Sequence, residues 1–128
     1  MDDSKKSIKS LKAKAWKLCS EYTRKKEERC FTCNTLVKFE ESDAGHFIHG
    51  HNKLTFFEPD NLHKQCKRCN LYLSGNGIIY SLRMIDQYGR NRVDELLKLS
   101  KNGKVHTRKD ILYWIKYYED AIDKLNKQ

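Results

Sequence analysis

Apolar positions at helical spacing occupy both ends of the chain. Residues 4–28 contain no Pro or Gly, and their apolar side chains recur every three or four residues: Ile8, Leu11, Ala15, Leu18 and Tyr22. Such spacing places them on one face of a helix. A second stripe near the C-terminus consists of Ile111, Ile115, Tyr118, Ile122 and Leu125. We expect these two stripes to pack in the core or to form the seam of a dimer.

The C-terminal stripe follows a helix-start signal. Thr107 and Asp110 occupy the two ends of a capping box, although such a box usually ends in Glu or Gln. Two shorter helices are predicted before it, at 78–88 and 93–99. The first of them carries the apolar residues Ile78, Ile79, Leu82 and Ile85. Gly89 directly after it is a natural C-terminal cap.

The middle of the chain has a different pattern. Residues 37–40, 45–48 and 54–57 are predicted as short strands, and the last of these is rich in β-forming residues. The sequence at 58–60 contains the one proline and interrupts the chain. Residues 61–73 are then predicted as a short helix. The expected fold class is therefore α+β and mainly helical.

Positive charge is concentrated outside this middle segment. The 128-residue chain has 26 Lys and Arg against 17 Asp and Glu, a net charge of +9. Residues 1–29 carry 10 basic and 5 acidic side chains, residues 30–76 carry 5 of each, and residues 77–128 carry 11 and 7. We take these as three regions of one structural domain. The balance favours a polyanion such as DNA, held by the flanks and processed at the centre, over helices that are merely solvated. The candidate DNA contacts are Lys9, Lys12, Arg24, Lys25, Lys67 and Arg68.

Composition also excludes some classes. The hydrophobic fraction is 38% and the charged fraction 34%, and no apolar run approaches the length of a membrane span. The N-terminus lacks the apolar core of a signal peptide, so we expect a cytoplasmic protein with no membrane partner. In a reducing compartment, five cysteines point to metal binding rather than to disulfides. Cys19 stands apart from the other four and is expected to be a buried, unreactive thiol.

Four cysteines form two C-x-x-C pairs. Cys30 and Cys33 make the first pair, and Cys66 and Cys69 the second, with 32 residues between the pairs. This arrangement predicts one tetrahedral zinc site per chain. Four thiolates leave no open coordination position, so the zinc would be structural. Loss of zinc should therefore abolish folding.

Three polar residues between and beside the pairs complete a motif. His46 precedes Asn61 by 15 residues, and Asn70 follows Asn61 by 9, directly after Cys69. The arrangement resembles the HNH, or His-Me finger, nucleases, whose ββα motif surrounds one divalent metal. The resemblance implies that His46 is the general base, that Asn61 orients it and that Asn70 binds the catalytic metal. An amide oxygen suits Mg²⁺ or Mn²⁺ better than imidazole does. The C-x-x-C-N ending is similar to that of the endonuclease VII type of junction resolvase.

A longer string resembles the phage lambda NinG (Rap) family. It consists of Ala44-Gly45-His46-Phe47, then Asn61-x-His63-x-Gln65-Cys66-x-x-Cys69-Asn70, then Leu73-Ser74-Gly75-Asn76 with Tyr80 and Tyr88-Gly89. Members of that family are recombination nucleases that act on branched DNA such as Holliday junctions and D-loops. The resemblance implies a phage- or prophage-encoded, structure-selective endonuclease. It also implies a zinc-stapled ββα core flanked by basic helices. Because symmetric cleavage of a four-way junction needs two active sites, we expect a homodimer.

One position departs from the HNH pattern. Gly45 precedes the predicted base, where many HNH enzymes have an Asp or His that serves as a second metal ligand. Asp43, two residues earlier, would lie on the same face of a strand as Gly45. We therefore expect Asp43 to supply the missing carboxylate, directly or through water. His63 and His49 are expected to support the site or to contact DNA.

Two other functions remain open at this stage. A non-catalytic zinc-ribbon module that binds nucleic acid would also combine four cysteines with basic helices. An HNH nicking or homing endonuclease with sequence preference would share the motif. The register of His46, Asn61 and Asn70 favours a nuclease, because a binding module does not need it.

Overall fold

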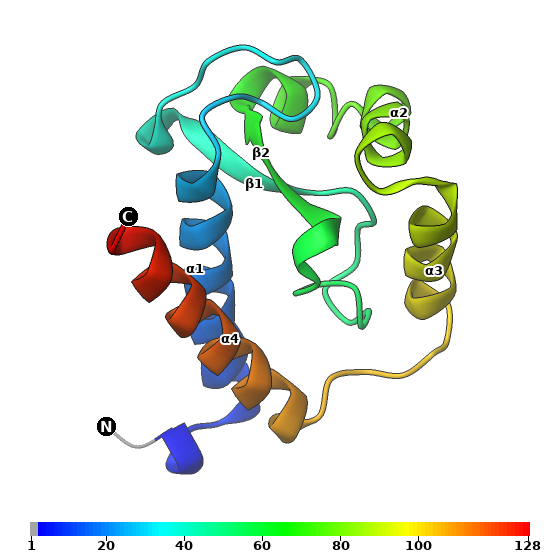
Figure 1. The fold of residues 1–128 in the computed structure, drawn as a ribbon. Coiled ribbons are helices and arrows are strands. Elements are labelled where there is room, and N and C mark those ends of the chain that lie inside the picture. The colour runs from blue at the N-terminus through cyan, green and yellow to red at the C-terminus, as the bar shows by residue number, and fades with distance from the viewer. Residues whose placement is uncertain (1–2) are drawn as a thin grey trace.

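The computed structural model describes residues 3–128, without the side chain of Ser4 (Figure 1). The longer helices are α1 (Ile8–Lys26), α2 (Gly77–Tyr88), α3 (Arg90–Ser100) and α4 (Arg108–Asn126). Two strands, β1 (Ser42–His46) and β2 (Leu62–Cys66), form one antiparallel sheet. The short elements are the 3-10 turns η1 (Asp3–Lys5), η2 (Phe39–Glu41) and η3 (Pro59–Asn61) and the π-helix η4 (Arg68–Tyr72). The protein is thus α+β and mainly helical, as predicted.

Helices α1 and α4 pack against each other on one side of the sheet, and α2 and α3 lie on the other (Figure 1). The core shared by α1 and α4 contains Leu11, Ala15, Cys19, Ile111, Ile115 and Tyr118. Most of both apolar stripes therefore packs within one chain, although Ile8, at the start of the first stripe, is 46% exposed. Cys19 is fully buried, as expected, and burial raises its pKa to about 12. The capping box is confirmed, since Asp110 N–H donates to Thr107 Oγ1 and Thr107 N–H to Asp110 Oδ2.

The prediction of a helix over residues 61–73 was wrong for its first half. That stretch begins with strand β2, which pairs with β1 in a register that sets His46 opposite Leu62 and Gly45 opposite His63. Only then does the chain turn into the π-helix η4, which carries Cys69 and Asn70. The predicted strand at 45–48 also lies earlier in the chain, at Ser42–His46.

Strand β2 escaped prediction because its buried residues are polar. His63, Lys64 and Gln65 are each at most 3% exposed. Every one of them has a tertiary partner: Lys64 Nζ donates to the carbonyl oxygen of Glu27, for example, at 2.9 Å. A strand buried on both faces normally reads as a continuous apolar run, so this one produced no strand signal.

The predictions of strands at 37–40 and 54–57 were also wrong. The first segment runs into the η2 turn, and the second forms turns in which Phe56 and Phe57 are buried. Both phenylalanines join the α1–α4 core. Their β-forming character reflects burial, because the β-propensity scale largely measures packing on a half-buried surface.

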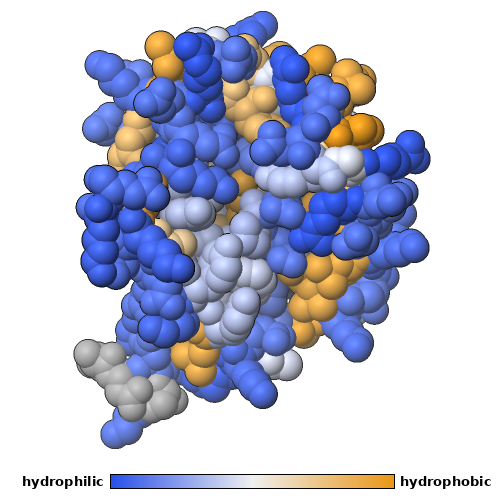
Figure 2. Space-filling view, viewed as in Figure 1, coloured by the Kyte–Doolittle hydropathy of each residue, from blue (hydrophilic) through white to orange (hydrophobic). Residues whose placement is uncertain are grey.

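A second, smaller core lies between α2, α3 and the first cysteine turn. It contains Tyr80, Met84, Val93 and Leu96. Gly89, with φ of 85°, ends α2 and donates its N–H to Ile85 O, which confirms the predicted cap. By contrast, the apolar residues of α2 named from the sequence are exposed, and Figure 2 shows apolar side chains gathered over this helix. Within residues 3–128, no helix combines the length and apolar character that a membrane span requires.

Candidate functional site

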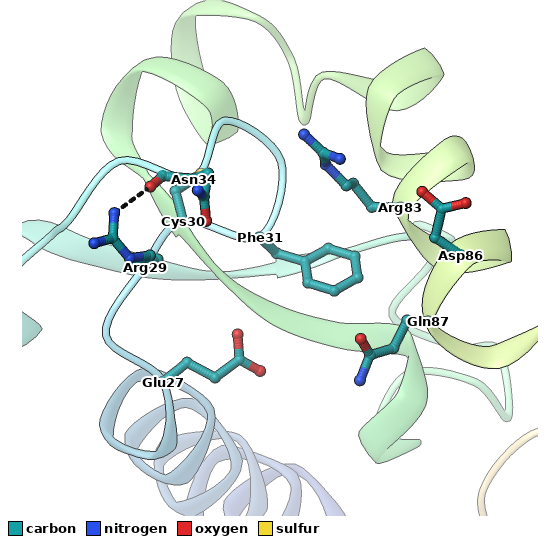
Figure 3. A pocket seen from close by; sticks show the side chains of 8 residues that line it. All are labelled: Glu27, Arg29, Cys30, Phe31, Asn34, Arg83, Asp86 and Gln87. Carbon is teal, nitrogen blue, oxygen red and sulfur yellow. Dashed lines mark hydrogen bonds between the residues drawn. The ribbon is translucent and has the colours of Figure 1, made fainter.

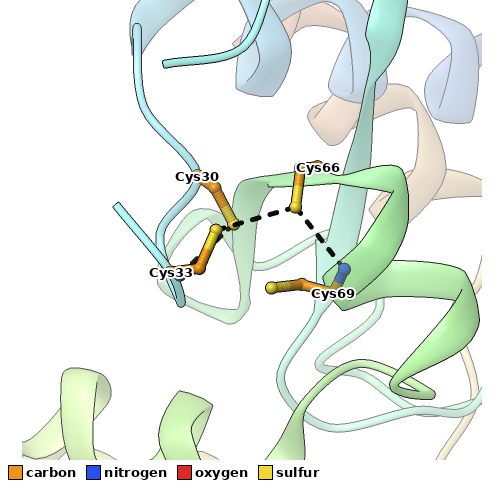
Figure 4. A group of neighbouring side chains, drawn as sticks. All are labelled: Cys30, Cys33, Cys66 and Cys69. Atoms are coloured by element: carbon orange, nitrogen blue, oxygen red, sulfur yellow. Dashed lines mark hydrogen bonds between the residues drawn. The ribbon is translucent and has the colours of Figure 1, made fainter. Parts of the chain in front are cut away.

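The four paired cysteines meet between the turn after α1 and the junction of β2 with η4 (Figure 4). Their sulfur atoms all lie within 4.8 Å of one another, and Cys33 Sγ is 3.7 Å from Cys66 Sγ. A tetrahedral zinc with Zn–S bonds of about 2.3 Å requires sulfur atoms roughly 3.8 Å apart. The cluster therefore has the size of a structural zinc site. It is the one group of three or more Cys, His, Asp or Glu side chains in the described chain that could hold a metal.

Hydroxyl groups surround these thiols. Thr32 Oγ1 lies 3.3 Å from Cys30 Sγ, and the Cys33 thiol donates to Thr35 Oγ1. Burial opposes ionisation of Cys30, but the Thr32 and backbone hydrogen bonds lower its pKa to about 6. Burial raises the pKa of Cys66 to about 12. Four thiolates this close together repel one another, so a bound cation is needed to ionise them all.

A hollow of about 510 Å³ contains the predicted base and the predicted metal ligand. His46 at the end of β1 and Asn70 on η4 both line it, together with His49. Helix α1 closes one side with Lys12 and Trp16. The structure thus brings together residues that are 24 positions apart in the sequence and places a basic helix beside them.

The hydrogen bond of the His46 ring determines its tautomer. Nε2 lies 2.9 Å from the carbonyl oxygen of Phe56, which can only accept, so Nε2 carries the proton and Nδ1 keeps a free lone pair. The ring packs against Trp16, with centroids 5.3 Å apart, and against Phe56, at 4.5 Å, and these two rings also contact each other, at 5.3 Å. Burial lowers the pKa of His46 to about 4, so the imidazole is neutral near pH 7.

Asn61 lies behind this ring and is fully buried. Its amide accepts from Ile48 N–H at 2.8 Å and donates to the carbonyl oxygens of Ile48 and Thr55, both at 3.0 Å. It therefore ties the chain after β1 to the residue next to Phe56, which holds His46. The contacts of Asn61 are with this loop and not with the imidazole.

Asn70 and Asp43 are direct neighbours. Asn70 Nδ2 donates to Asp43 Oδ2 at 3.0 Å, which leaves Asn70 Oδ1 free to act as a ligand. The other carboxylate oxygen of Asp43 forms an ion pair with Lys67. Asp43, Asn70 and Lys67 line a second hollow of about 400 Å³, which also includes Arg24. Asn70 lines both hollows.

The glycine before the predicted base is explained by its neighbour across the sheet. A Cβ on Gly45 would overlap Gln65 Oε1 and lie 2.7 Å from Gln65 Cδ. Gln65 is fully buried, and its Nε2 donates to Thr32 Oγ1 and to the carbonyl oxygen of Gly75. A side chain at position 45 would therefore collide with Gln65.

His63 is 1% exposed, and its ring contacts Tyr80 and Tyr88 of α2. Tyr80 O–H donates to the carbonyl oxygen of Gly45 at 2.7 Å, so its oxygen accepts from His63 Nδ1–H at 2.9 Å. His63 Nε2 in turn accepts from Tyr88 O–H at 2.6 Å. Burial lowers the pKa of His63 to about 3. The His63 ring thus holds α2 against β2, and Tyr80 also ties α2 to Gly45 of β1, the strand that ends in His46.

The predicted DNA contacts fall into two groups. Lys12, Arg24 and Lys67 line the two hollows, and Lys12 Nζ reaches His51 O at 3.4 Å. The remaining three, Lys9, Lys25 and Arg68, are exposed. His49 is exposed as well, at the rim of the first hollow.

Sequence reasoning missed Trp16 and Phe56, whose rings both pack against His46. Trp16 carries no motif, and the available signal was its position as the one aromatic residue on the lysine-rich face of the first helix. Phe56 was assigned to a strand, so its carbonyl contact with His46 was not foreseen.

Another hollow, of about 410 Å³, lies beside the first cysteine turn (Figure 3). Phe31 forms part of its wall, with Arg29 and Glu27 on one side and Arg83 and Asp86 of α2 on the other. Its charges are balanced, and it contains neither His46 nor Asn70. It is therefore separate from the candidate site.

The fold and this site define a small α+β protein in which a Cys₄ cluster that could hold a zinc ion accompanies a hollow lined by His46 and Asn70. The family model described as "Bacteriophage Lambda NinG protein" matches residues 2–128, so the chain belongs to the NinG family.

Several phage proteins named "Protein ninG" are similar to this chain. That of Escherichia phage lambda is 39% identical over 69 residues, and those of Escherichia phage 933W and Salmonella phage P22 are 37% identical over 68 residues. Each match covers 52% of this chain and 33% of the relative, so the matched segment spans about a third of the length of these relatives. No solved structure matches the chain.

Proposed function

We propose that this protein is a metal-dependent, structure-selective DNA endonuclease that hydrolyses phosphodiesters in branched recombination intermediates such as Holliday junctions and D-loops. The observation that carries the proposal is the shared hollow of His46 and Asn70. His46, whose Nδ1 is not used in the bond to Phe56, lines the same hollow as Asn70, whose Oδ1 is not used in the bond to Asp43. The order β1, β2, η4 supports an HNH-type ββα core.

In this proposal His46 is the general base. Its neutral Nδ1 takes a proton from the attacking water, since Nε2 is already bonded to Phe56. Asn61 positions His46 by fixing the loop that supplies this carbonyl group. Lys12 at the rim of the hollow would hold a DNA phosphate. The expected products are a 5′-phosphate and a 3′-hydroxyl.

The catalytic metal would be Mg²⁺ or Mn²⁺ held by Asn70 Oδ1, with Asp43 as the predicted second ligand. Such a cation typically keeps several waters and needs only one or two protein oxygens, so two ligands fit it. When bound, it would polarise the phosphate and stabilise the leaving oxygen. In the structure Asp43 contacts Lys67 and Asn70, so a bound cation would compete with Lys67 for the carboxylate.

The zinc at Cys30, Cys33, Cys66 and Cys69 would be structural. It would fix the helix that bears Asn70 relative to the strand pair that bears His46, because Cys66 ends β2 and Cys69 lies within η4. A homodimer stays our expectation for cutting both strands of a junction.

Two alternatives remain. A non-catalytic zinc-ribbon module would bind nucleic acid through the basic residues. It would not need a neutral His46 packed against Trp16 and Phe56. An HNH nicking or homing endonuclease would cut linear DNA with sequence preference.

One experiment separates these functions. A labelled four-way junction and its matched linear duplex are incubated with the protein in Mg²⁺ or Mn²⁺, beside a zinc-loaded His46→Ala variant. Branch-specific cleavage that is lost in the folded variant supports the proposal. Cleavage of specific linear sequences favours the homing endonuclease, and tight binding without cleavage by either protein in any divalent metal favours the zinc-ribbon module.

A further inference from the structure

The π-helix η4 ends in three consecutive apolar residues that face water. Tyr72 is 83% exposed, Leu71 60% and Leu73 40%. We call Leu71, Tyr72 and Leu73 the apolar tip. The chain has 34% charged residues and a mean hydropathy of −0.85. In so polar a chain, a run of exposed apolar residues indicates a surface that binds a partner.

The apolar tip is firmly held at its base. Leu73 N–H donates to Arg68 O, which closes the π-turn, and Gly75 N–H donates to Cys69 O, both at 2.9 Å. The carbonyl oxygen of Gly75 accepts from the buried Gln65. Cys69 also belongs to the four-cysteine cluster. The backbone that carries the exposed ring of Tyr72 is therefore held in place by hydrogen bonds and by this cluster.

The apolar tip also adjoins the candidate site. Leu71 directly follows Asn70 and lines the same 400 Å³ hollow as Asn70 and Asp43. Lys67 and Arg68, on the other side of Asn70 in the sequence, are exposed. The surface next to the proposed scissile phosphate therefore combines positive charge with one large aromatic ring.

We infer that the apolar tip receives an unstacked base at a DNA branch, with the ring of Tyr72 stacked on it. This inference rests on the proposed function and gives a source for its selectivity. Apolar and aromatic side chains inserted into DNA must unstack base steps, and bases already unpaired at a branch are the least costly to expose. Lys67 and Arg68 would hold the flanking phosphates.

A second copy of the chain fits this surface less well. A two-fold contact sets each patch against itself, which would bring like charges together around the apolar tip. Arg68 forms no ion pair within the described part of the chain, so nothing there neutralises it. A polyanion supplies the opposite charge.

The test uses the full chain, zinc-loaded, in a His46→Ala background so that no cleavage occurs. A four-way junction carries 2-aminopurine at the branch, and a linear duplex carries it in the same sequence. We expect the protein to raise 2-aminopurine fluorescence only in the junction. Tyr72→Ala should remove this rise and weaken junction binding about tenfold, while Tyr72→Phe keeps both. Tyr113→Ala, which truncates a 59% exposed tyrosine on α4, is the matched control and should behave like the parent.

Salt dependence distinguishes lost stacking from a damaged protein. Tyr72→Ala should keep the slope of log K against log salt concentration, because the phosphate contacts are unchanged. An unchanged fluorescence rise and branch preference in Tyr72→Ala would overturn the inference alone. So would a parent dimer that Tyr72→Ala dissociates without changing the fluorescence. Failure of the parent to bind either DNA would overturn the proposed function, and the inference with it.

Discussion

The indole ring of Trp16 lies almost parallel to the imidazole ring of His46, at 17°, with the centroids 5.3 Å apart. The contact joins a basic helix to the end of the strand that carries the proposed base. It also removes water from one face of the imidazole. Desolvation disfavours the charged form of histidine, and it is the main reason that the pKa of His46 falls from 6.5 to about 4.

Truncating the indole should therefore raise the pKa of His46. We expect Trp16→Ala to shift it upward by about one unit or more, toward the value of a solvated histidine. NMR titration of the His46 ring measures it directly, and the acidic limb of the pH–rate profile should move upward in parallel. Trp114→Ala, on α4 and in contact with Tyr117 and Tyr118 rather than with His46, is a suitable control. An unchanged His46 pKa in Trp16→Ala would show that the indole does not contribute to the desolvation that lowers it.

Gly45 should not tolerate a side chain. Gly45→Ala places its Cβ against Gln65, which is buried and held by two hydrogen bonds. We expect a loss of about 1–3 kcal/mol in the free energy of unfolding, measured by denaturant titration. Gly77→Ala is the matched control, because a Cβ there meets nothing within 4 Å, and its stability should be unchanged or higher. If both variants are equally stable, Gln65 can move aside, and its contact does not explain why position 45 is a glycine.

The extent to which this molecule could be predicted depended on how local each signal is. The cysteine pairs and the positions of His46 and Asn70 could be recognised because ligand spacing and motif strings are local in sequence. Strand β2 could not, because His63, Lys64 and Gln65 are buried only through partners elsewhere in the chain. The role of Gly45 likewise depends on Gln65 across the sheet. The stacking of Trp16 on His46 depends on how α1 packs, which no local pattern reports.

Zinc should be inseparable from folding. In Cys69→Ser we expect zinc content to fall well below one per chain and the cooperative unfolding transition to be lost, because this cysteine joins η4 to the cluster. Elemental analysis and thermal unfolding followed by circular dichroism measure both. Cys19→Ala serves as the control, since Cys19 lies in the α1–α4 core, and it should keep its zinc. A stable, fully folded Cys69→Ser protein without metal would refute a structural role for zinc.

The buried His63 should make the fold sensitive to acid. Its pKa is about 3 in the folded state and 6.5 when solvated. Below pH 6.5 the unfolded chain therefore binds a proton that the folded chain does not, and stability falls as the pH drops from about 6.5 toward 3. His63→Phe loses its bonds to Tyr80 and Tyr88 and is less stable at pH 7. Its free energy of unfolding should nevertheless depend less on pH, by up to about 1.4 kcal/mol per pH unit. Denaturant titrations at several pH values test this, and an unchanged pH dependence would contradict it.

Asp43 offers a test of the proposed catalytic metal. If Asp43 is a ligand, Lys67 and the metal ion compete for its carboxylate, because one carboxylate oxygen already pairs with Lys67. We expect Asp43→Ala and Asp43→Asn both to weaken Mn²⁺ binding by on the order of tenfold or more, because neither retains a charged oxygen.

Removing the positive charge of Lys67 should strengthen metal binding. Lys67→Ala should tighten Mn²⁺ binding, whereas Lys116→Ala, which removes an α4 lysine paired with Asp120, should leave it unchanged. Calorimetric titration of the zinc-loaded protein measures all four variants. If Asp43→Asn binds Mn²⁺ as the parent does while Asp43→Ala does not, Asp43 acts only by accepting the hydrogen bond from Asn70 Nδ2. Unchanged affinity in Asp43→Ala would remove Asp43 from the metal site altogether.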